Sequence, residues 1–322
     1  MMESYLDAAV ERVAIGEVGK SGASIERVRM PDGRRLVVKR VSPDSDLFMR
    51  VLGRRTYPEL DLWQRGILDE IPLPATHSVV DGWVDGDLTV LVMRDLGDRV
   101  LTWDDRLSRP DCQRVLGAAA TVHRTFEGRA PWGLTPLGDL LSLFAPQRVA
   151  PQAEGSELAR TCLYGWELFA ERVEQRVSEP VLALLAEPTP LVAALERCPC
   201  TLIHGDLATV NVALETNRVT LLDWAMPARA PGAVDVARFI AGCSSVVDAS
   251  REEILADYRD AAGPSYDGNA MRLAMLSGLV WLGWNKAFDA AEHPDPALRL
   301  REQADLDWWV READLTLRSG LL

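Results

Sequence analysis

Residues 202–225 read LIHGDLATVNVALETNRVTLLDWA. The apolar runs 210–214 and 219–224 are rich in β-branched residues, which is typical of strands, and the turn-forming Asn217 lies between them. Polar residues lie at the ends of both runs, although a charge that is buried without a partner is costly. The stretch therefore predicts a hairpin whose polar ends have a chemical role.

A turn centred on Asn217 would place Asn211 directly opposite Asp223, with both side chains on one face about 5 Å apart. An amide oxygen and a carboxylate are hard ligands that suit Mg²⁺, which takes the rest of its shell from water and substrate phosphates. Asp206, in the loop before the first strand, is then placed to accept the proton of an attacking hydroxyl. A loop capped by Asx turns explains any one of these residues, but not their combined spacing. The stretch predicts phosphoryl transfer, with Asp206 as the base and Asn211 and Asp223 as metal ligands.

The motif His-Gly-Asp-Leu-x-x-x-Asn at 204–211, followed by Leu-Leu-Asp-Trp at 221–224, resembles that of the aminoglycoside phosphotransferase and choline kinase family. Members of this family are small-molecule kinases, so the resemblance implies ATP or another nucleoside triphosphate as the phosphoryl donor. It implies that the acceptor is a hydroxylated small molecule, such as an aminoglycoside-like antibiotic or a metabolite. It also implies that Asp206 is the catalytic base and that Asn211 and Asp223 hold Mg²⁺.

The distribution of strand and helix signals indicates two lobes. Short β-like runs dominate the first third of the chain, at 24–30, 34–41, 77–84 and 88–93. Helix periodicity dominates from residue 111 onward, at 111–126, 157–177, 269–291 and 298–317. Together with the resemblance, this predicts an α+β, protein-kinase-like fold. We expect a β-rich, nucleotide-binding N-lobe at 1–95 and a mainly helical C-lobe at 96–322, which carries the catalytic loop and the acceptor-binding helices. A cleft between two such lobes is a natural ligand site.

Lys39 lies in a predicted strand at 34–41, in a chain that has only three lysines among its 35 basic residues. A kinase of this type needs a lysine on the third strand to hold the nucleotide phosphates, and the resemblance gives Lys39 that role. Its helical partner would be Glu59, although Thr56 and Glu59 also have the spacing of a capping box. The sequence leaves both explanations of Glu59 open.

A glycine-rich segment at 16–24 leads into the predicted strand at 24–30, as a phosphate-covering loop should. It is two residues too short to be a Walker A motif, and a glycine-rich turn would have the same composition. With Lys39 following it, we interpret the segment as the nucleotide loop, with Gly19, Ser21 and Gly22 near the phosphates.

The apolar run at 88–93 continues into a polar linker, as the hinge between two kinase lobes does. By the resemblance, Met93 would back the adenine pocket, and the main chain of Arg94 and Leu96 would bind the base. Met93 as an ordinary core residue is an equally good explanation.

Composition sets the class of partner. The chain has 322 residues and a formal net charge of −13, which argues against nucleic acid and anionic membranes as partners. Its five cysteines are sparse and odd in number, which suits a reducing compartment. The N-terminus shows no basic start followed by an apolar run, and we therefore expect a cytoplasmic protein. The oligomeric state is left open.

The alternative function is a catalytically inactive kinase-like protein that binds nucleotides or regulates a partner. Such a protein usually lacks at least one of the four central residues, yet Lys39, Asp206, Asn211 and Asp223 are all present. Gly205 stands where protein kinases usually carry Arg, which favours a small-molecule substrate over a protein.

The acceptor site is less defined by the sequence. Trp281, Trp284 and Asn285 could line it, but their helical spacing is explained as simply by a core stripe. Four acidic residues could receive the amines of an aminoglycoside, although a solvated helix face is the simpler interpretation: Asp289, Glu292, Asp305 and Asp307.

Overall fold

The computed structural model describes residues 3–15, 22–103 and 105–322. The predicted phosphate-loop residues Gly19 and Ser21 lie outside the described residues.

The strands are β1 (Glu11–Ile15), β2 (Ser24–Arg29), β3 (Arg35–Val41), β4 (Ala75–Thr76), β5 (Val79–Asp85), β6 (Leu88–Arg94), β7 (Thr201–Ile203), β8 (Val212–Glu215), β9 (Arg218–Leu221) and β10 (Ala228–Ala230). The α-helices are α1 (Leu47–Val51), α2 (Pro58–Gln64), α3 (Arg109–Phe126), α4 (Leu137–Leu141), α5 (Pro146–Val149), α6 (Glu157–Arg172), α7 (Gln175–Ala186), α8 (Thr189–Glu196), α9 (Ala233–Cys243), α10 (Arg251–Ala262), α11 (Gly268–Glu292) and α12 (Pro296–Leu317).

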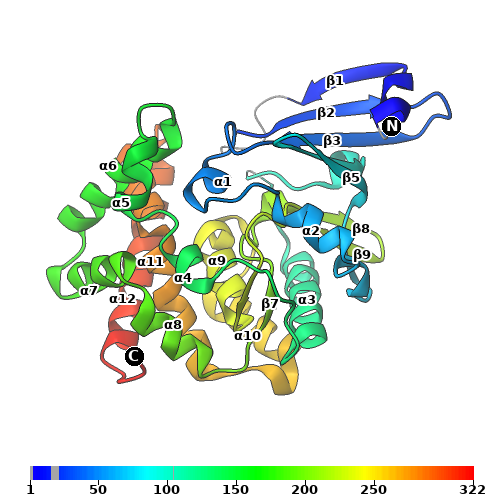
Figure 1. Ribbon diagram of the computed structural model, residues 1–322. Helices are drawn as coiled ribbons and strands as arrows, with labels where there is room; N and C mark the ends of the chain where they lie inside the picture. The colour runs from blue at the N-terminus through cyan, green and yellow to red at the C-terminus, as the bar shows by residue number, and fades with distance from the viewer. Residues whose placement is uncertain (1–2, 16–21, 104) are drawn as a thin grey trace.

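An antiparallel sheet in the order β1-β2-β3-β6-β5 forms the N-terminal part, and the helices lie beside and below it in Figure 1. Because side chains alternate between the two faces of a strand, β3 divides its residues between two environments. Leu36 and Val38 join a small core on one face, whereas Val37 and Lys39 line a cavity on the other. The alternation of side chains along β3 therefore directs Lys39 into that cavity.

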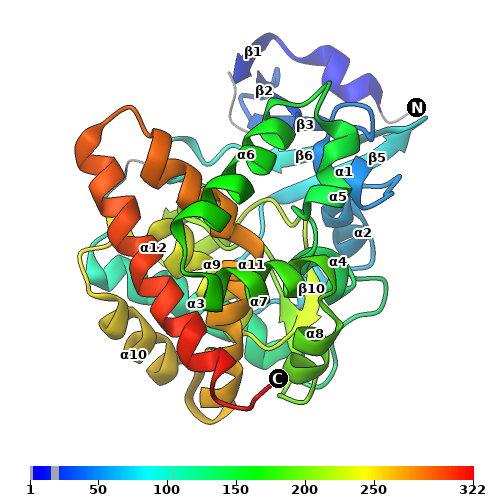
Figure 2. The same cartoon turned by 90° about the vertical axis from the view of Figure 1, so that its left-hand side faces the viewer.

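Helix α11 is the centre of the C-terminal part and is 25 residues long. It packs against α6, α9 and α12, and Figure 2 shows α12 running beside it. Its N-cap Asp267 accepts hydrogen bonds from the backbone N–H of Asn269 and Ala270, at 2.7 and 2.9 Å, which fixes where the helix begins. The helices predicted at 269–291 and 298–317 are confirmed as α11 and α12.

The single helix predicted at 157–177 is wrong, because the chain breaks there into α6 and α7. Val173 has an extended backbone, with φ −94° and ψ 134°, and its N–H caps α6 by bonding to the Phe169 carbonyl.

Among the described residues, no single helix is both long and apolar enough to cross a membrane. Helices α7 and α8 pass that test only as a pair, which is bent by 85°.

The predicted hairpin is present as β8 and β9, but its register differs from the prediction by one residue. Val212 pairs with Leu221, because two residues form the turn and it is not centred on Asn217. Asn211 is therefore opposite Leu222, whose N–H bonds to the Asn211 carbonyl at 2.8 Å. A one-residue slip would normally send Asn211 and Asp223 to opposite faces.

Both residues nevertheless reach the same place, because neither belongs to a regular strand. Asn211 ends a 3₁₀ turn at Thr209–Asn211, and Asp223 has a left-handed backbone with φ +61°. That conformation is uncommon outside glycine and redirects the Asp223 side chain. The irregular ends of the hairpin bring the two side chains together.

Candidate active site

Asp206 lies in the loop between β7 and the 3₁₀ turn, and both of its carboxylate oxygens are held. Arg238 on α9 donates from Nε to Asp206 Oδ1 at 2.8 Å, and Asn211 Nδ2 donates to Oδ2 at 3.2 Å. Asn211 Nδ2 also donates to the Asp206 carbonyl at 2.8 Å. The side chain is still 23% exposed, so the carboxylate is fixed in direction and open to a pocket.

A buried network around Asp235 fixes the shape of this loop. Asp235 accepts the backbone N–H groups of His204 and Gly205, both at 2.8 Å, and it also contacts His123 Nε2 at 3.0 Å. Burial alone would raise the pKa of Asp235, but the hydrogen bonds from His123 and the loop outweigh it and lower the pKa. The ring of His204 supports the loop from the other side, because Nε2 lies 2.8 Å from the Leu222 carbonyl.

The backbone at position 205 requires glycine, for a reason that the sequence interpretation missed. Its φ is +84°, and a Cβ at this position would clash with the main-chain carbonyl of Met226. Position 205 therefore does not admit an arginine, and the guanidinium that contacts Asp206 comes from Arg238 on α9 instead.

The buried Lys39 forms an ion pair with the partly exposed Asp223, with Nζ 2.8 Å from Oδ1. Burial lowers the pKa of Lys39, but the charges of Asp223 and Glu59 outweigh it and the net pKa is raised. The charge of Lys39 likewise offsets the burial of Asp223 and leaves its pKa lowered. Tyr57 completes the group: its hydroxyl accepts from Lys39 Nζ at 2.7 Å and donates to Asp223 Oδ1. The sequence interpretation missed Tyr57, whose only signal is its position just before α2.

Glu59 lies in the first turn of α2 and is fully buried. The capping-box explanation is wrong, because the N-cap is Tyr57 and no side-chain bond from the described residues caps the helix. Burial raises the pKa of Glu59 to about 7, although the charge of Lys39 and the backbone N–H groups of Trp224 and Asp223 act in the opposite direction. Glu59 and Lys39, both described, are not joined by a direct ion pair, so Asp223 is the direct partner of Lys39 in this structure.

A cavity of about 230 Å³ lies between the sheet and the hairpin. Its walls are mostly apolar, and four of the predicted residues form its polar end: Lys39, Glu59, Asn211 and Asp223. Met93, Arg94 and Leu96 line it where the hinge was predicted, and Arg94 uses its N–H to bond the Ser78 carbonyl at 2.9 Å. Because this bond uses the main-chain N–H of Arg94, its carbonyl is the main-chain group of that residue left to contact a base.

Gly22 is not one of the described residues that line this cavity. The backbone conformation at position 22 nevertheless requires glycine. Its φ is +112°, and a Cβ there would clash with the main-chain carbonyl of Ser45. The segment that enters β2 is therefore held close to the loop before α1.

A second pocket, of about 180 Å³, opens beside the first. Asp206 and Arg238 line it, together with Trp281, Trp284 and Asn285 from α11. The two tryptophans are only 2% and 5% exposed, so they are buried in the core and also form a wall of the pocket. Asn211 and Asp223 line both cavities, which therefore meet at the two predicted metal ligands.

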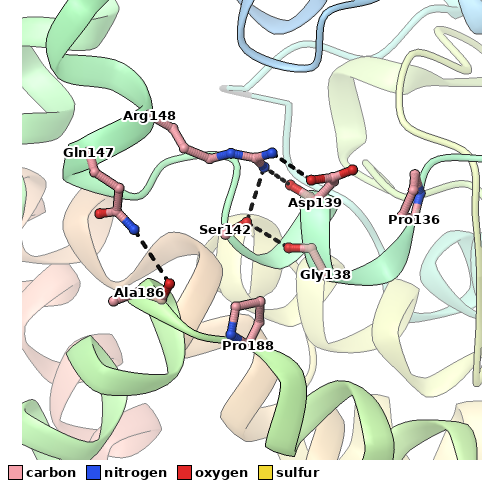
Figure 3. Close-up of a pocket in the computed structure, with 8 residues that line it drawn as sticks. All are labelled: Pro136, Gly138, Asp139, Ser142, Gln147, Arg148, Ala186 and Pro188. Carbon is pink, nitrogen blue, oxygen red and sulfur yellow. Dashed lines mark hydrogen bonds and ion pairs between the residues drawn. The ribbon is translucent and has the colours of Figure 1, made fainter.

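Another hollow, of about 410 Å³, lies among α4, α5 and the start of α8 and is shown in Figure 3. Arg148 bonds there to Asp139 and Ser142, and Gln147 bonds to the Ala186 carbonyl. Its polar side chains thus bond to one another, and none of the predicted site residues lines it.

The donor set at the junction of the two cavities fits Mg²⁺ better than a transition metal. The described part of the chain has no cluster of three or more His, Cys, Asp or Glu side chains that could hold a metal ion by themselves. Asn211 and Asp223 supply oxygen only, and Mg²⁺ commonly takes one or two protein ligands and completes its shell with water and phosphate. Asp223 is paired with Lys39, so a metal ion would have to compete for the same carboxylate.

The chain belongs to the phosphotransferase enzyme family, whose sequence profile matches residues 19–273. It is therefore a phosphotransferase, with the kinase-like α+β fold that the neighbouring structures share. None of the curated proteins compared with the chain matches it significantly in sequence.

Three solved structures illustrate the fold. An aminoglycoside phosphotransferase from Alicyclobacillus acidocaldarius has 17% identity and a TM-score of 0.53, over 99% of this chain and 96% of that one. Aminoglycoside phosphotransferase APH(3'')-Id from Streptomyces rimosus, in complex with ADP and streptomycin, has 19% identity and a TM-score of 0.52, over 82% and 94%. Choline kinase LicA from Streptococcus pneumoniae has 11% identity and a TM-score of 0.56, over 96% of both chains.

Proposed function

We propose that the protein is an ATP-dependent O-phosphotransferase that moves the γ-phosphate to a hydroxyl group of a small molecule. The observation that carries the proposal is the junction of two cavities at Asn211 and Asp223. One cavity has Lys39 at its polar end and the other has Asp206. A phosphoryl group bound at that junction would lie between a nucleotide on one side and an acceptor on the other.

In this proposal the acceptor hydroxyl lies next to Asp206, which takes its proton as the oxygen attacks the γ-phosphorus. The bond from the γ-phosphorus to the bridging oxygen breaks, and ADP leaves with that electron pair. Arg238 and Asn211 hold the Asp206 carboxylate in a fixed orientation through charged and neutral hydrogen bonds. Mg²⁺, held by Asn211 and Asp223, would neutralise phosphate charge.

Lys39 exchanges one anion for another during nucleotide binding. It is paired with Asp223 in this structure, and in the proposal its ammonium group would bind the nucleotide phosphates, while Asp223 would help to hold Mg²⁺. Besides Asp223, the charge of Glu59 raises the pKa of Lys39, and the Tyr57 hydroxyl accepts a hydrogen bond from its ammonium group at 2.7 Å. We assign the adenine to the apolar end of the first cavity, against Met93, with the Arg94 carbonyl and Leu96 main chain beside it, and the phosphates to the segment with Gly19, Ser21 and Gly22.

The neighbouring structures support a small-molecule acceptor. One of them holds ADP and streptomycin and another is a choline kinase, although both share only the fold with this chain at the identities given above. We expect a hydroxylated antibiotic or metabolite as the acceptor, and a reducing, cytoplasmic location that suits the five free cysteines.

The test is an ADP-release assay with ATP and Mg²⁺ against aminoglycosides, other antibiotics, choline, sugars and amino alcohols, with Asp206→Asn as the blank. A signal that disappears in the variant supports the proposal and identifies the acceptor class. If the wild-type protein neither releases ADP nor binds Mg²⁺-ATP by calorimetry, the proposal fails and an inactive kinase-like protein becomes the better account.

A further inference from the structure

The second cavity has aromatic walls. Phe48 from α1, Phe144, Trp281 and Trp284 line it, and Trp103 lines it with a side chain that is 47% exposed. The Phe144 ring lies 5.1 Å from that of Trp284 and 6.5 Å from that of Trp281, centroid to centroid, so three of these rings form one cluster. Such walls bind the apolar face of a ligand.

The charges in this pocket are already balanced. Among the described residues that line it, the carboxylates are Asp206 and Asp223. Asp206 is paired with Arg238 and Asp223 with Lys39, and on the proposed function Mg²⁺ takes the place of Lys39. No carboxylate described here is left to receive an ammonium group from an acceptor.

Arg238 already occupies the place beside Trp281 that an aromatic wall would otherwise offer to a cation. Its guanidinium carbon lies 5.8 Å from the centroid of the Trp281 ring. A second cation brought against this ring would have to displace that guanidinium.

The four acidic residues considered for amine binding have other partners and do not line the pocket. Asp305 pairs with Arg251 and Lys286, Glu292 accepts from Tyr164, Asp307 accepts from Gln303, and Asp289 accepts from Asn285. Asp305 thus joins α12 to α10 and α11, Glu292 joins α11 to α6, and Asp289 and Asp307 bond within their own helices.

The tryptophans also favour an oxygen-rich ligand. The Nε1 atoms of Trp281 and Trp284 have no hydrogen-bond partner among the described residues. A hydroxyl or ether oxygen could accept from such a donor, whereas an ammonium has no lone pair to offer. Neither nitrogen is open to solvent, so this bond forms only if an indole turns as the ligand enters.

We propose that the acceptor presents to this pocket an uncharged hydroxylated ring or short chain with an apolar face, and not an amine or a quaternary ammonium. This inference rests on the proposed function, because it takes Asp206 as the base. The volume of about 180 Å³ sets the size, since a cavity of about 150 Å³ holds a benzene ring. One six-membered ring therefore fits.

The test compares acceptors in matched pairs that differ in charge. Choline is paired with dimethylbutanol, in which carbon replaces the nitrogen, and glucosamine is paired with glucose. Transfer from Mg²⁺-ATP by the wild-type protein is measured for all four, and binding is followed by calorimetry. We expect kcat/KM for the uncharged members to exceed that of the charged members by at least about tenfold.

A variant locates the site. Trp284→Phe keeps an aromatic wall and loses no hydrogen bond within the described residues, so it should fold normally. It should raise the acceptor KM about three- to tenfold and leave the Kd for Mg²⁺-ATP unchanged. Trp132→Phe, at a side chain that is 79% exposed and outside the pocket, is the matched control and should change neither.

The outcomes separate the two proposals. Preferred transfer to the charged members, or an unchanged acceptor KM in Trp284→Phe, overturns this inference and leaves the phosphotransferase assignment intact. Binding of Mg²⁺-ATP without binding or transfer of any uncharged probe also overturns it, because these probes represent the class. Failure to bind Mg²⁺-ATP at all overturns the proposed function itself.

Discussion

Arg238 on α9 donates from Nε to Asp206 Oδ1 at 2.8 Å, and so a guanidinium from a different element holds the carboxylate proposed as the base. Both side chains are mostly buried, which makes the pair stronger than one on the surface. Arg238→Met should lower kcat about 10- to 100-fold and leave the Kd for ATP unchanged, because a charged hydrogen bond contributes about 1.5–3 kcal/mol.

Arg109→Met is the matched control for this change. Arg109 binds Asp257 through two nitrogens, both at 3.0 Å, and joins α3 to α10 outside both cavities. It should lower the melting temperature without changing kcat. Equal kcat values for Arg238→Met and the wild type would contradict the role given to Arg238.

Asp206→Asn should lower kcat about 10²- to 10⁴-fold, the usual contribution of a general base. Its affinity for Mg²⁺-ATP should stay near the wild-type value, since Asp206 lines the second cavity but not the first. Steady-state kinetics and calorimetry on the same preparation check both halves. Turnover at the wild-type rate would exclude Asp206 as the base.

Asp223→Asn should abolish the Mg²⁺ dependence of ATP binding, because it removes a carboxylate from the predicted metal site and the direct partner of Lys39. The Kd for ATP is measured by calorimetry with Mg²⁺ and with EDTA. We expect at least about a tenfold difference between the two conditions in the wild type and none in the variant. Asp139→Asn, in the hollow of Figure 3, should keep the wild-type difference.

Glu59 should make the free protein less stable as the pH rises. Its pKa is about 7 in the folded state, against an ordinary value of 4.5, so the folded protein holds a proton that the unfolded chain loses. Stability therefore falls between about pH 4.5 and pH 7 and stays lower above, by about 3 kcal/mol for this group.

Glu59→Gln should remove this part of the pH dependence. The free energy of unfolding, measured by urea titration at pH 5 and pH 8, should fall less in the variant than in the wild type. The exposed Glu171→Gln serves as the control. A pH dependence in Glu59→Gln equal to that of the wild type would show that burial of this carboxyl does not hold its proton.

Gly205→Ala should disrupt the catalytic loop. The left-handed φ of +84° and the clash of a Cβ with the Met226 carbonyl both oppose any side chain here. We expect a loss of activity and of several degrees in the melting temperature. Gly117→Ala, on α3 with open space around its Cβ, should be neutral or stabilising by up to about 1 kcal/mol. Full activity in Gly205→Ala would contradict the strain argument.

Local patterns in the sequence carried much of the fold. The strand predicted at 34–41 is present as β3, and the periodic runs of α11 and α12 predicted those helices nearly to their ends. The predicted hairpin register was wrong by one residue, because a two-residue turn and a turn centred on Asn217 look alike in sequence. The left-handed backbone of Asp223 could not be expected from an aspartate in an apolar run.

Contacts between residues that are distant in sequence could not be predicted from local patterns. Arg238 lies 32 residues after Asp206, on a helix whose sequence looks like ordinary core, and only the folded chain brings them together. Tyr57, Lys39 and Asp223 contact one another although they lie at α2, on β3 and after β9. The aromatic pocket needed α1 and α11 to be placed in space before its tryptophans could be distinguished from a core stripe.

The most direct measurement follows the γ-phosphate itself. ATP labelled in that group is incubated with Mg²⁺, the wild-type protein and an acceptor that gives ADP release, and the label is traced to acceptor, water or protein. The account predicts label on an acceptor hydroxyl with the wild type, and at least about a hundredfold less with Asp206→Asn. Label found only in free phosphate, or equal transfer by the two proteins, would contradict it.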